Sequence, residues 1–262
     1  MRILYAEQME HYNKGGRALW DPPRRSDMRV GTLGYFNDDR VWNPMALITD
    51  PEAVKDIPGL TPMTARVKSF EEEEANWSPL KSSNVAEIGP SLELAVSAPG
   101  LPIEASASLT LKNSDDFGCV LTVSNPVKKE GYYGPEGPWR SWMDDNLKAI
   151  QDYMTKADVK KYGLFIVTKT YSVKSAIIAI KDGRSSKVAL GFSAKVPAIG
   201  ELGPHADWSK TTSDEAIFKF DSKGDDMRVV IVQGIYFTLN FFNKVRLMGL
   251  LEVALTWIDR VW

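Results

Sequence analysis

The chain has 262 residues, a net charge of −2 at pH 7, 44% hydrophobic residues and 25% charged residues. These values are typical of globular proteins and exclude disordered and collagen-like chains, while the charge argues against a generally basic nucleic-acid-binding protein. A single cysteine, Cys119, excludes an internal disulfide and favours a reducing compartment. Two histidines and one cysteine are also too few for the usual zinc sites, so we expect neither a cofactor nor a metal.

Motifs for catalysis and for membrane-spanning helices are missing. Residues 191–195 approach a nucleophile elbow, but Lys195 stands where the second glycine is required. The sequence has no phosphate-binding loop and no dinucleotide fingerprint. Its longest uncharged run, residues 229–243, has 15 residues, whereas a spanning helix needs about 20 apolar ones. Because the first residues show no secretory signal either, we expect a cytoplasmic, non-catalytic protein.

The N-terminal third combines a helix with a hairpin. Apolar residues recur at helical spacing over residues 3–13, and Gly15 and Gly16 then end the predicted amphipathic helix. A strand-like run over residues 30–36, a polar turn at residues 37–40 and the pair Val41 and Trp42 predict a hairpin. Glu71 to Glu74 form an acidic run, interpreted as a solvated patch.

Residues 88–123 change to a period of two, which predicts strands with one apolar face. The apolar positions before and after a Pro99-Gly100 turn are Leu92, Leu94, Val96, Ile103, Ala105, Leu109 and Leu111. Phe117, Cys119, Leu121 and Val123 continue the alternation. Residues 131–138 are predicted as a loop.

The remaining sequence alternates between helix and strand patterns. An amphipathic helix is predicted over residues 139–157, with Trp139, Ile150 and Tyr153 on its apolar stripe. Strands follow over residues 164–180 and 187–197, with Asp182-Gly183 predicting a hairpin turn between them. The chain closes with a strand over residues 229–237 and a helical stripe from Leu247 to Trp262. We predict one α+β domain over residues 1–262, a twisted and largely antiparallel sheet flanked by helices.

The alternating strands fit two environments, a sheet half-covered by helices and a barrel strand in a bilayer. A spanning strand needs about 9–11 residues, and the runs 103–112 and 187–197 have 10 and 11. Between residues 160 and 197, eight basic residues face one aspartate, a local net charge of +7. That charge favours an anionic surface such as acidic lipid, although a solvated sheet face explains it equally well.

The order of these features resembles the pore-forming N-terminal domain of gasdermins, most closely the short fungal gasdermin-like proteins of regulated, heterokaryon-incompatibility-type cell death. Residues 33–50 resemble that family's first hairpin and following short helix. The paired alternating strands of residues 88–111, the helix from Trp139 and the strand of residues 164–171 follow in the family's order. The resemblance covers nearly the whole chain.

The resemblance implies a soluble protein that binds acidic phospholipids, oligomerises and inserts two β-hairpins per subunit into the plasma membrane. The corresponding segments here are residues 88–112 and 168–196, in which Val188, Leu190, Phe192 and Val196 join the apolar positions given above as lipid-facing. Lys187 and Lys195 are implied to face the lumen. Contacts with acidic lipid are implied for Lys14, Arg17, Arg24 and Arg25.

Activation is implied to differ from the animal pattern, because the chain carries no large C-terminal inhibitory domain. Two routes stay open: removal of a short C-terminal tail, for which residues 247–262 are a candidate, and co-assembly with a related allelic variant. Two further functions also stay open. One is a lipid- or carbohydrate-binding β module that never inserts and uses the eight tryptophans as stacking platforms; the other is a hydrolase with a dispersed triad using His205.

Overall fold

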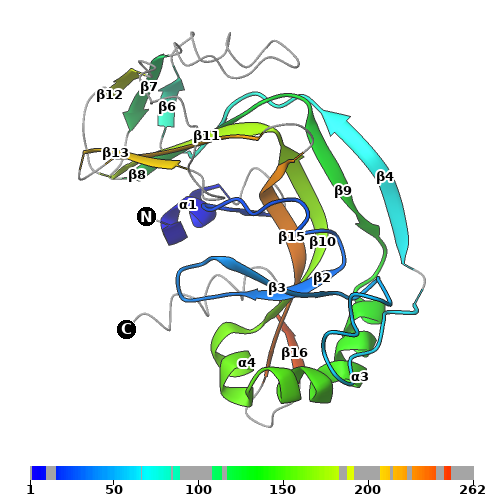
Figure 1. The fold of residues 1–262 in the computed structure, drawn as a ribbon. Coiled ribbons are helices and arrows are strands. Elements are labelled where there is room, and N and C mark those ends of the chain that lie inside the picture. The colour runs from blue at the N-terminus through cyan, green and yellow to red at the C-terminus, as the bar shows by residue number, and fades with distance from the viewer. Residues whose placement is uncertain are drawn as a thin grey trace. The chain divides into compact units, whose positions relative to one another are not determined.

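The computed structural model describes residues 2–9, 16–65, 67–83, 85–88, 108–113, 117–182, 188–191, 207–212, 215–222, 226–239 and 245–248. The fold is α+β, with antiparallel sheets and few helices, as predicted (Figure 1). The chain forms two compact units of three segments each. Unit 1 comprises Met1–Pro22, Glu74–Lys128 and Tyr171–Ile231, and unit 2 comprises Pro23–Glu73, Lys129–Thr170 and Val232–Trp262. That residues 1–262 act as a single domain stays a prediction.

Unit 1 contains two sheets. The five-stranded sheet has the order β13 (Asp207–Thr212), β14 (Glu215–Asp221), β11 (Ser175–Asp182), β8 (Phe117–Val123) and β5 (Leu80–Lys81). The three-stranded sheet has the order β12 (Val188–Gly191), β7 (Ser108–Asn113) and β6 (Val85–Ile88), which lie side by side in Figure 1. Helix α1 (Arg2–Gln8) and the short β1 (Arg17–Ala18) complete the unit.

The strand predicted over residues 117–123 is confirmed as β8, but the expected polar face is not, because every residue of β8 is buried. Its register with β11 sets Leu121 opposite Ile178 and Cys119 opposite Ile180, and all four side chains are buried in one hydrophobic cluster. On the far side of β11, Phe218 of β14 lies opposite Ile178 and joins the same cluster. The intervening residues of β8 are buried as well, so this strand is covered on both faces. A strand covered on one side only would expose every second side chain to solvent, and β8 has no such exposed face.

Most of the eight-stranded sheet belongs to unit 2. Its strand β10 (Leu164–Val173) has β15 (Arg228–Leu239), β2 (Thr32–Phe36) and β9 (Val127–Tyr133) among its neighbours. Residues 127–128, 171–173 and 228–231 at the ends of β9, β10 and β15 belong to unit 1. β3 (Trp42–Leu47) pairs with β2, β16 (Val245–Met248) with β15, and β4 (Lys68–Ala75) with β9. Helices α3 (Gly137–Tyr153) and α4 (Lys156–Tyr162) pack into the core of unit 2 through side chains that include Trp139, Trp142, Ile150 and Val159.

The hairpin predicted near the N-terminus is confirmed as β2 and β3, and the strands predicted over residues 164–180 and 229–237 are confirmed as β10, β11 and β15. The helix predicted over residues 3–13 is present as α1 from Arg2 to Gln8, and residues 10–13 lie outside the described residues. The short helix implied within residues 33–50 was wrong, because β3 continues to Leu47 in register with Thr32.

The helix predicted over residues 139–157 was wrong at its end. Met154 has extended backbone angles and ends α3, and Thr155 then caps α4 by accepting a hydrogen bond from the Asp158 backbone N–H. Tyr153, placed on the apolar stripe by its spacing, is 56% exposed. The buried polar residue that spacing missed is Asn146, whose side chain accepts hydrogen bonds from Thr61 and donates one to the Trp142 carbonyl.

Three other predictions were wrong because strand pairing overrode local pattern. The loop expected over residues 131–138 is strand to Tyr133 and helix from Gly137, since β9 is held between β10 and β4. Leu247, expected in a helix, lies in β16 opposite Phe237. The hairpin expected around Asp182-Gly183 would pair its flanking strands, but β12 pairs with β7 and β11 pairs with β8 and β14.

Candidate functional site

The three-stranded sheet β12–β7–β6 brings together the two segments expected to enter a membrane. Leu111 lies opposite Val188, and Leu109 lies opposite Leu190. Directly opposed residues of an antiparallel pair share a face of the sheet. The apolar positions assigned separately to the two segments therefore share one face, while the rungs between them, Thr110 with Ala189 and Ser108 with Gly191, share the other.

β6 extends this arrangement on the other edge of β7. Ile88 lies opposite Leu111 and Glu87 opposite Lys112, in an antiparallel pairing with an irregularity between Val85 and Glu87. The central strand β7 is therefore hydrogen-bonded to β6, from the same predicted segment, on one edge. On its other edge it is hydrogen-bonded to β12, from the second predicted segment.

Several candidate residues lie outside the described residues. They are Leu92, Leu94, Val96, Ile103, Ala105, Phe192 and Val196 of the lipid-facing sets, Lys187 and Lys195 of the lumen-facing set, and Lys14 of the lipid contacts. His205, which the hydrolase alternative would use, lies there too. Their assignments stay predictions.

Residues 175–182 of the second segment form β11, which is part of the five-stranded sheet and not of the three-stranded one. β11 is the central strand of the five-stranded sheet, and its residues Ile177, Ile178 and Ala179 are all buried. Consecutive buried residues mean that both faces of β11 are covered by protein. Among the described residues of the second segment (168–196), those of β12 pair with the first segment (88–112).

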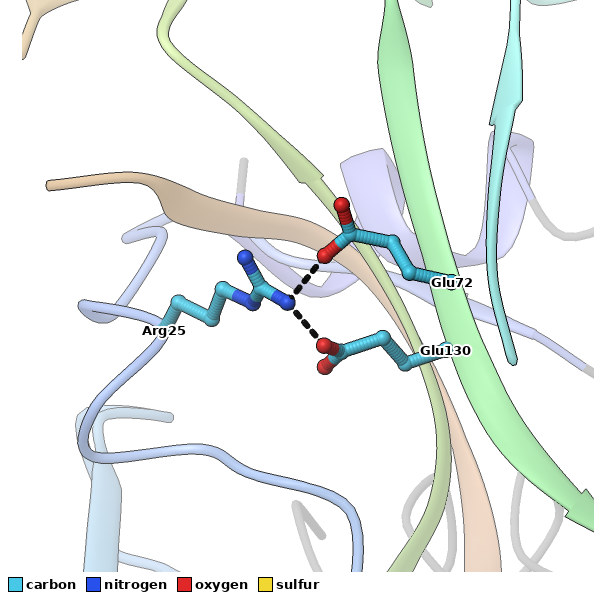
Figure 2. Close-up of polar contacts among 3 residues, drawn as sticks. All are labelled: Arg25, Glu72 and Glu130. Atoms are coloured by element: carbon cyan, nitrogen blue, oxygen red, sulfur yellow. Dashed lines mark hydrogen bonds and ion pairs between the residues drawn. The ribbon is translucent and has the colours of Figure 1, made fainter. Parts of the chain in front are cut away.

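Arg25, expected to contact lipid, lies between two carboxylates. Its guanidinium donates to Glu72 of β4 and to Glu130 of β9, and Figure 2 shows both carboxylates pointing toward it from neighbouring strands. All three side chains are about 30% exposed or less, at 27%, 32% and 27%. The contact ties the segment before β2 to the β4–β9 pair of unit 2. Two other residues expected to contact lipid are described. Arg17 lies in β1. Arg24 begins a turn in which its backbone carbonyl accepts hydrogen bonds from the Asp27 and Met28 N–H groups.

The same two strands carry a second cluster, built around Phe70. The Lys129 ammonium lies 4.9 Å from the centre of the Phe70 ring and is paired with Glu73 at 2.7 Å, and the Lys169 ammonium lies 5.9 Å from the same ring. The pKa of Lys169 is lowered mainly by burial and also by the nearby positive charge of Lys129. Gly131 makes room for the ring, because a Cβ there would lie 2.6 Å from Phe70 and 2.9 Å from the Thr168 carbonyl oxygen.

The tip of the β2–β3 hairpin is attached to the end of α4. The Lys161 ammonium donates to the Asp38 carboxylate at 2.5 Å, and the Tyr162 hydroxyl lies 3.3 Å from the same oxygen. The hydrogen bond from Lys161 lowers the pKa of Asp38, and the same bond raises the pKa of Lys161. The tip of the hairpin therefore contacts α4 through its charged side chain.

The core of unit 1 buries two titratable groups, Tyr5 of α1 and Cys119 of β8. Tyr5 is fully buried, packs edge-on against Trp20 with ring centres 5.7 Å apart, and its hydroxyl has no hydrogen-bond partner within the described part of the chain. Burial raises its pKa well above the usual value. Burial also raises the pKa of the Cys119 thiol to about 12, so this thiol stays protonated and unreactive at neutral pH.

The five tryptophans whose side chains the structure describes give little support to a carbohydrate-stacking surface. Trp20, Trp42, Trp139 and Trp142 are buried, and Trp77 is half-buried against the core of unit 1. A stacking platform must present a ring face to solvent. Within the described ranges, no helix is long and apolar enough to cross a membrane, and no three His, Cys, Asp or Glu side chains are grouped to hold a metal ion.

The chain is similar to several solved structures, among them two gasdermins. A bacterial gasdermin from Bradyrhizobium tropiciagri is 14% identical, with 87% of this chain and 84% of that chain covered and a TM-score of 0.35. The Gasdermin A3 membrane pore is 8% identical, with coverages of 93% and 92% and a TM-score of 0.28. No protein-family model matches the chain, and no curated protein matches it.

Proposed function

We propose that this protein forms membrane pores of the gasdermin type, inserting the strands that begin at β6, β7 and β12 as part of a β-barrel wall. The observation that carries the proposal is the register of β7 with β12, which sets Leu109 and Leu111 opposite Leu190 and Val188. A barrel wall needs neighbouring strands whose apolar residues share the lipid face and whose small or polar residues share the lumen face.

The remaining parts of the proposal follow the resemblance. The protein waits in the cytoplasm, docks on acidic phospholipid of the plasma membrane through its basic residues, and oligomerises with copies of itself or with a related allelic variant. Lipid docking is attractive because each basic residue near an anionic membrane contributes about 1 kcal/mol. The outcome is regulated cell death in an allorecognition response, with no nucleic acid and no catalysis involved.

The test is release of a trapped dye from vesicles containing acidic phospholipid, compared with neutral vesicles. We expect release from the acidic vesicles under activating conditions, that is, with a related variant present or with residues 247–262 removed. Leu190→Asp puts a charge on the lipid face of every subunit at a cost of roughly 1–2 kcal/mol each, and we expect it to abolish release.

Ala189→Asp is the matched control, because the same side chain one residue earlier lies on the opposite face of the ladder. We expect Ala189→Asp to release dye, and we expect Ser193→Ala to do so too. Binding to vesicles without any release, under every activating condition, would overturn the pore and favour the non-inserting lipid-binding module.

A further inference from the structure

Lys169 is a half-buried lysine of β10 that lies near a second cation of unit 2. Its ammonium is 5.9 Å from the centre of the Phe70 ring, and the Lys129 ammonium is 4.9 Å from the same centre. The strands that carry the two lysines, β10 and β9, are neighbours in the sheet. The two ammonium groups therefore lie within roughly one Debye length of each other, where like charges repel.

The two lysines differ in their carboxylate partners. Glu73 of β4 pairs with Lys129 at 2.7 Å, whereas Lys169 has no ion pair with any residue that the structure describes. Glu73 attracts Lys169 from a greater distance, but burial and the charge of Lys129 affect this amine more strongly. Lys169 is therefore the cation of the cluster whose charge is less well compensated.

The Phe70 ring is the apolar surface beside both ammonium groups. Gly131 lets the ring lie against β9, because a Cβ at that position would be 2.6 Å from it. A half-buried ammonium has lost part of its water, which disfavours the charged form. At 5.9 Å, Lys169 is at the outer limit of a cation–π contact, so the ring compensates little of this loss. The lowered pKa of Lys169 agrees with this geometry.

A lysine amine attacks an electrophile only in its neutral form. Partial burial and a neighbouring cation are two ways in which proteins activate an amine, and Lys169 has both. The Lys129 ammonium has a second effect, because it attracts a phosphate dianion, which can displace the singly charged and 50% exposed Glu73. The electrophile that suits both lysines is an acyl phosphate, in which one oxygen joins an acyl group to a phosphate.

We propose that Lys169 is an acylation site for acyl phosphates, and that Lys129 is the positioning residue that holds the phosphate of the donor. The neutral Nζ of Lys169 attacks the carbonyl carbon, the bond from that carbon to the bridging oxygen breaks, and inorganic phosphate leaves with the electron pair. The nitrogen releases one proton to water, and a neutral amide remains. Acylation removes one of the two cations near Phe70 and leaves Lys129 with Glu73. This site does not depend on pore formation.

Acetyl phosphate is the probe, and the intact 262-residue chain is the substrate. The rate of acetylation at each lysine is measured near neutral pH by mass spectrometry of peptides, with Lys148, an exposed lysine of α3, as the internal reference. We expect Lys169 to react roughly three- to tenfold faster than Lys148, because a lower pKa increases the neutral fraction of an amine more than it lowers its nucleophilicity. A rate at Lys169 that does not exceed the rate at Lys148 would overturn the proposal.

Two variants separate the charge of Lys129 from its size. Lys129→Met removes the cation and keeps a long side chain, and we expect the rate at Lys169 to fall by roughly threefold or more. Lys129→Arg keeps the cation, and we expect at least about half of the parent rate to remain. Circular dichroism and the rate at Lys148 report that each variant is folded. An unchanged rate in Lys129→Met, or an equal fall in both variants, would contradict the role of the Lys129 charge and overturn the proposal.

A neutral donor, N-acetylimidazole, tests whether Lys129 holds the phosphate. With this donor, Lys129→Met is expected to slow acetylation of Lys169 less than it does with acetyl phosphate, because only the effect on the amine remains. An equal loss with both donors would overturn the assignment of Lys129 as the residue that positions the phosphate.

Discussion

Tyr5→Phe should make this protein more stable, because it removes a polar group that unit 1 buries without a partner. The Tyr5 side chain is 0% exposed, and its hydroxyl finds no hydrogen-bond partner among the described residues. Burying an unsatisfied hydroxyl costs about 1–3 kcal/mol. Phenylalanine keeps the ring and its edge-on contact with Trp20, so little packing is lost.

The size of the gain follows from that cost. A gain of about 1–3 kcal/mol corresponds to a rise in Tm of about 2–10 °C for a chain of this length. Tyr153→Phe is the matched control, since its hydroxyl is on a ring that is 56% exposed. That variant should change the free energy of unfolding by no more than about 0.5 kcal/mol. Thermal melts followed by circular dichroism measure both.

The pH dependence provides a sharper signature. Burial raises the pKa of Tyr5, so the folded protein holds the phenol proton after the unfolded chain, whose pKa is about 10, has released it. Stability contributed by the neutral phenol is therefore complete below pH 10 and is lost as the pH rises. The advantage of Tyr5→Phe over the parent should grow by about 1.4 kcal/mol per pH unit above 10. Cys119, whose pKa burial raises in the same direction, is common to both proteins and cancels in the difference. A Tm equal to or below that of the parent, with no widening at high pH, would show that the hydroxyl is satisfied and refute the reasoning.

Two further predictions concern unit 2. Arg25→Met should destabilise the protein by about 1–2 kcal/mol by leaving the Glu72 and Glu130 carboxylates together without their cation, and the loss should shrink in a Glu72→Gln, Glu130→Gln background when measured by urea unfolding. Gly163→Ala should destabilise it by more than about 1 kcal/mol in the same assay, because Gly163 has φ 68° and a Cβ there would meet the Tyr236 hydroxyl; an unchanged midpoint in the presence of urea would contradict this.

The sequence predicted strands in which apolar and polar residues alternate, but it missed a strand made mostly of charged residues. The alternation of Cys119 and Leu121 locates β8 because both side chains enter one core. β4 was missed, since its sequence is dominated by Glu71 to Glu74 and gives no apolar period. It is a strand because β9 supplies its hydrogen bonds and because Arg25 and Lys129 meet two of its glutamates. Such partners come from distant parts of the chain and leave no local signal.

The end of α3 shows the opposite case, in which the signal was present. Thr155 followed by Asp158 has the spacing of an N-terminal cap, and the structure uses it to begin α4. The apolar spacing continued through Met154 and concealed it. At Leu247 nothing local could decide, because its strand exists only through pairing with Phe237.

Alternating apolar residues occur both in strands of a protein core and in strands suited to a bilayer. The residues between the apolar positions, which form the other face of the strand, distinguish the two. In β8 the residues between the apolar positions include Val120 and Thr122, both buried, and in β11 they include Ile177. Both strands are therefore committed to protein on both faces and would lose that packing by moving into lipid. Opposite their apolar positions, β7 carries Ser108, Thr110 and Lys112 and β12 carries Ala189 and Gly191, which are small or polar residues that a water-filled lumen accepts. Under the proposed pore function, this asymmetry would restrict the lipid-facing part of the second segment to the residues from Val188 onward, with β10 and β11 remaining as protein scaffold.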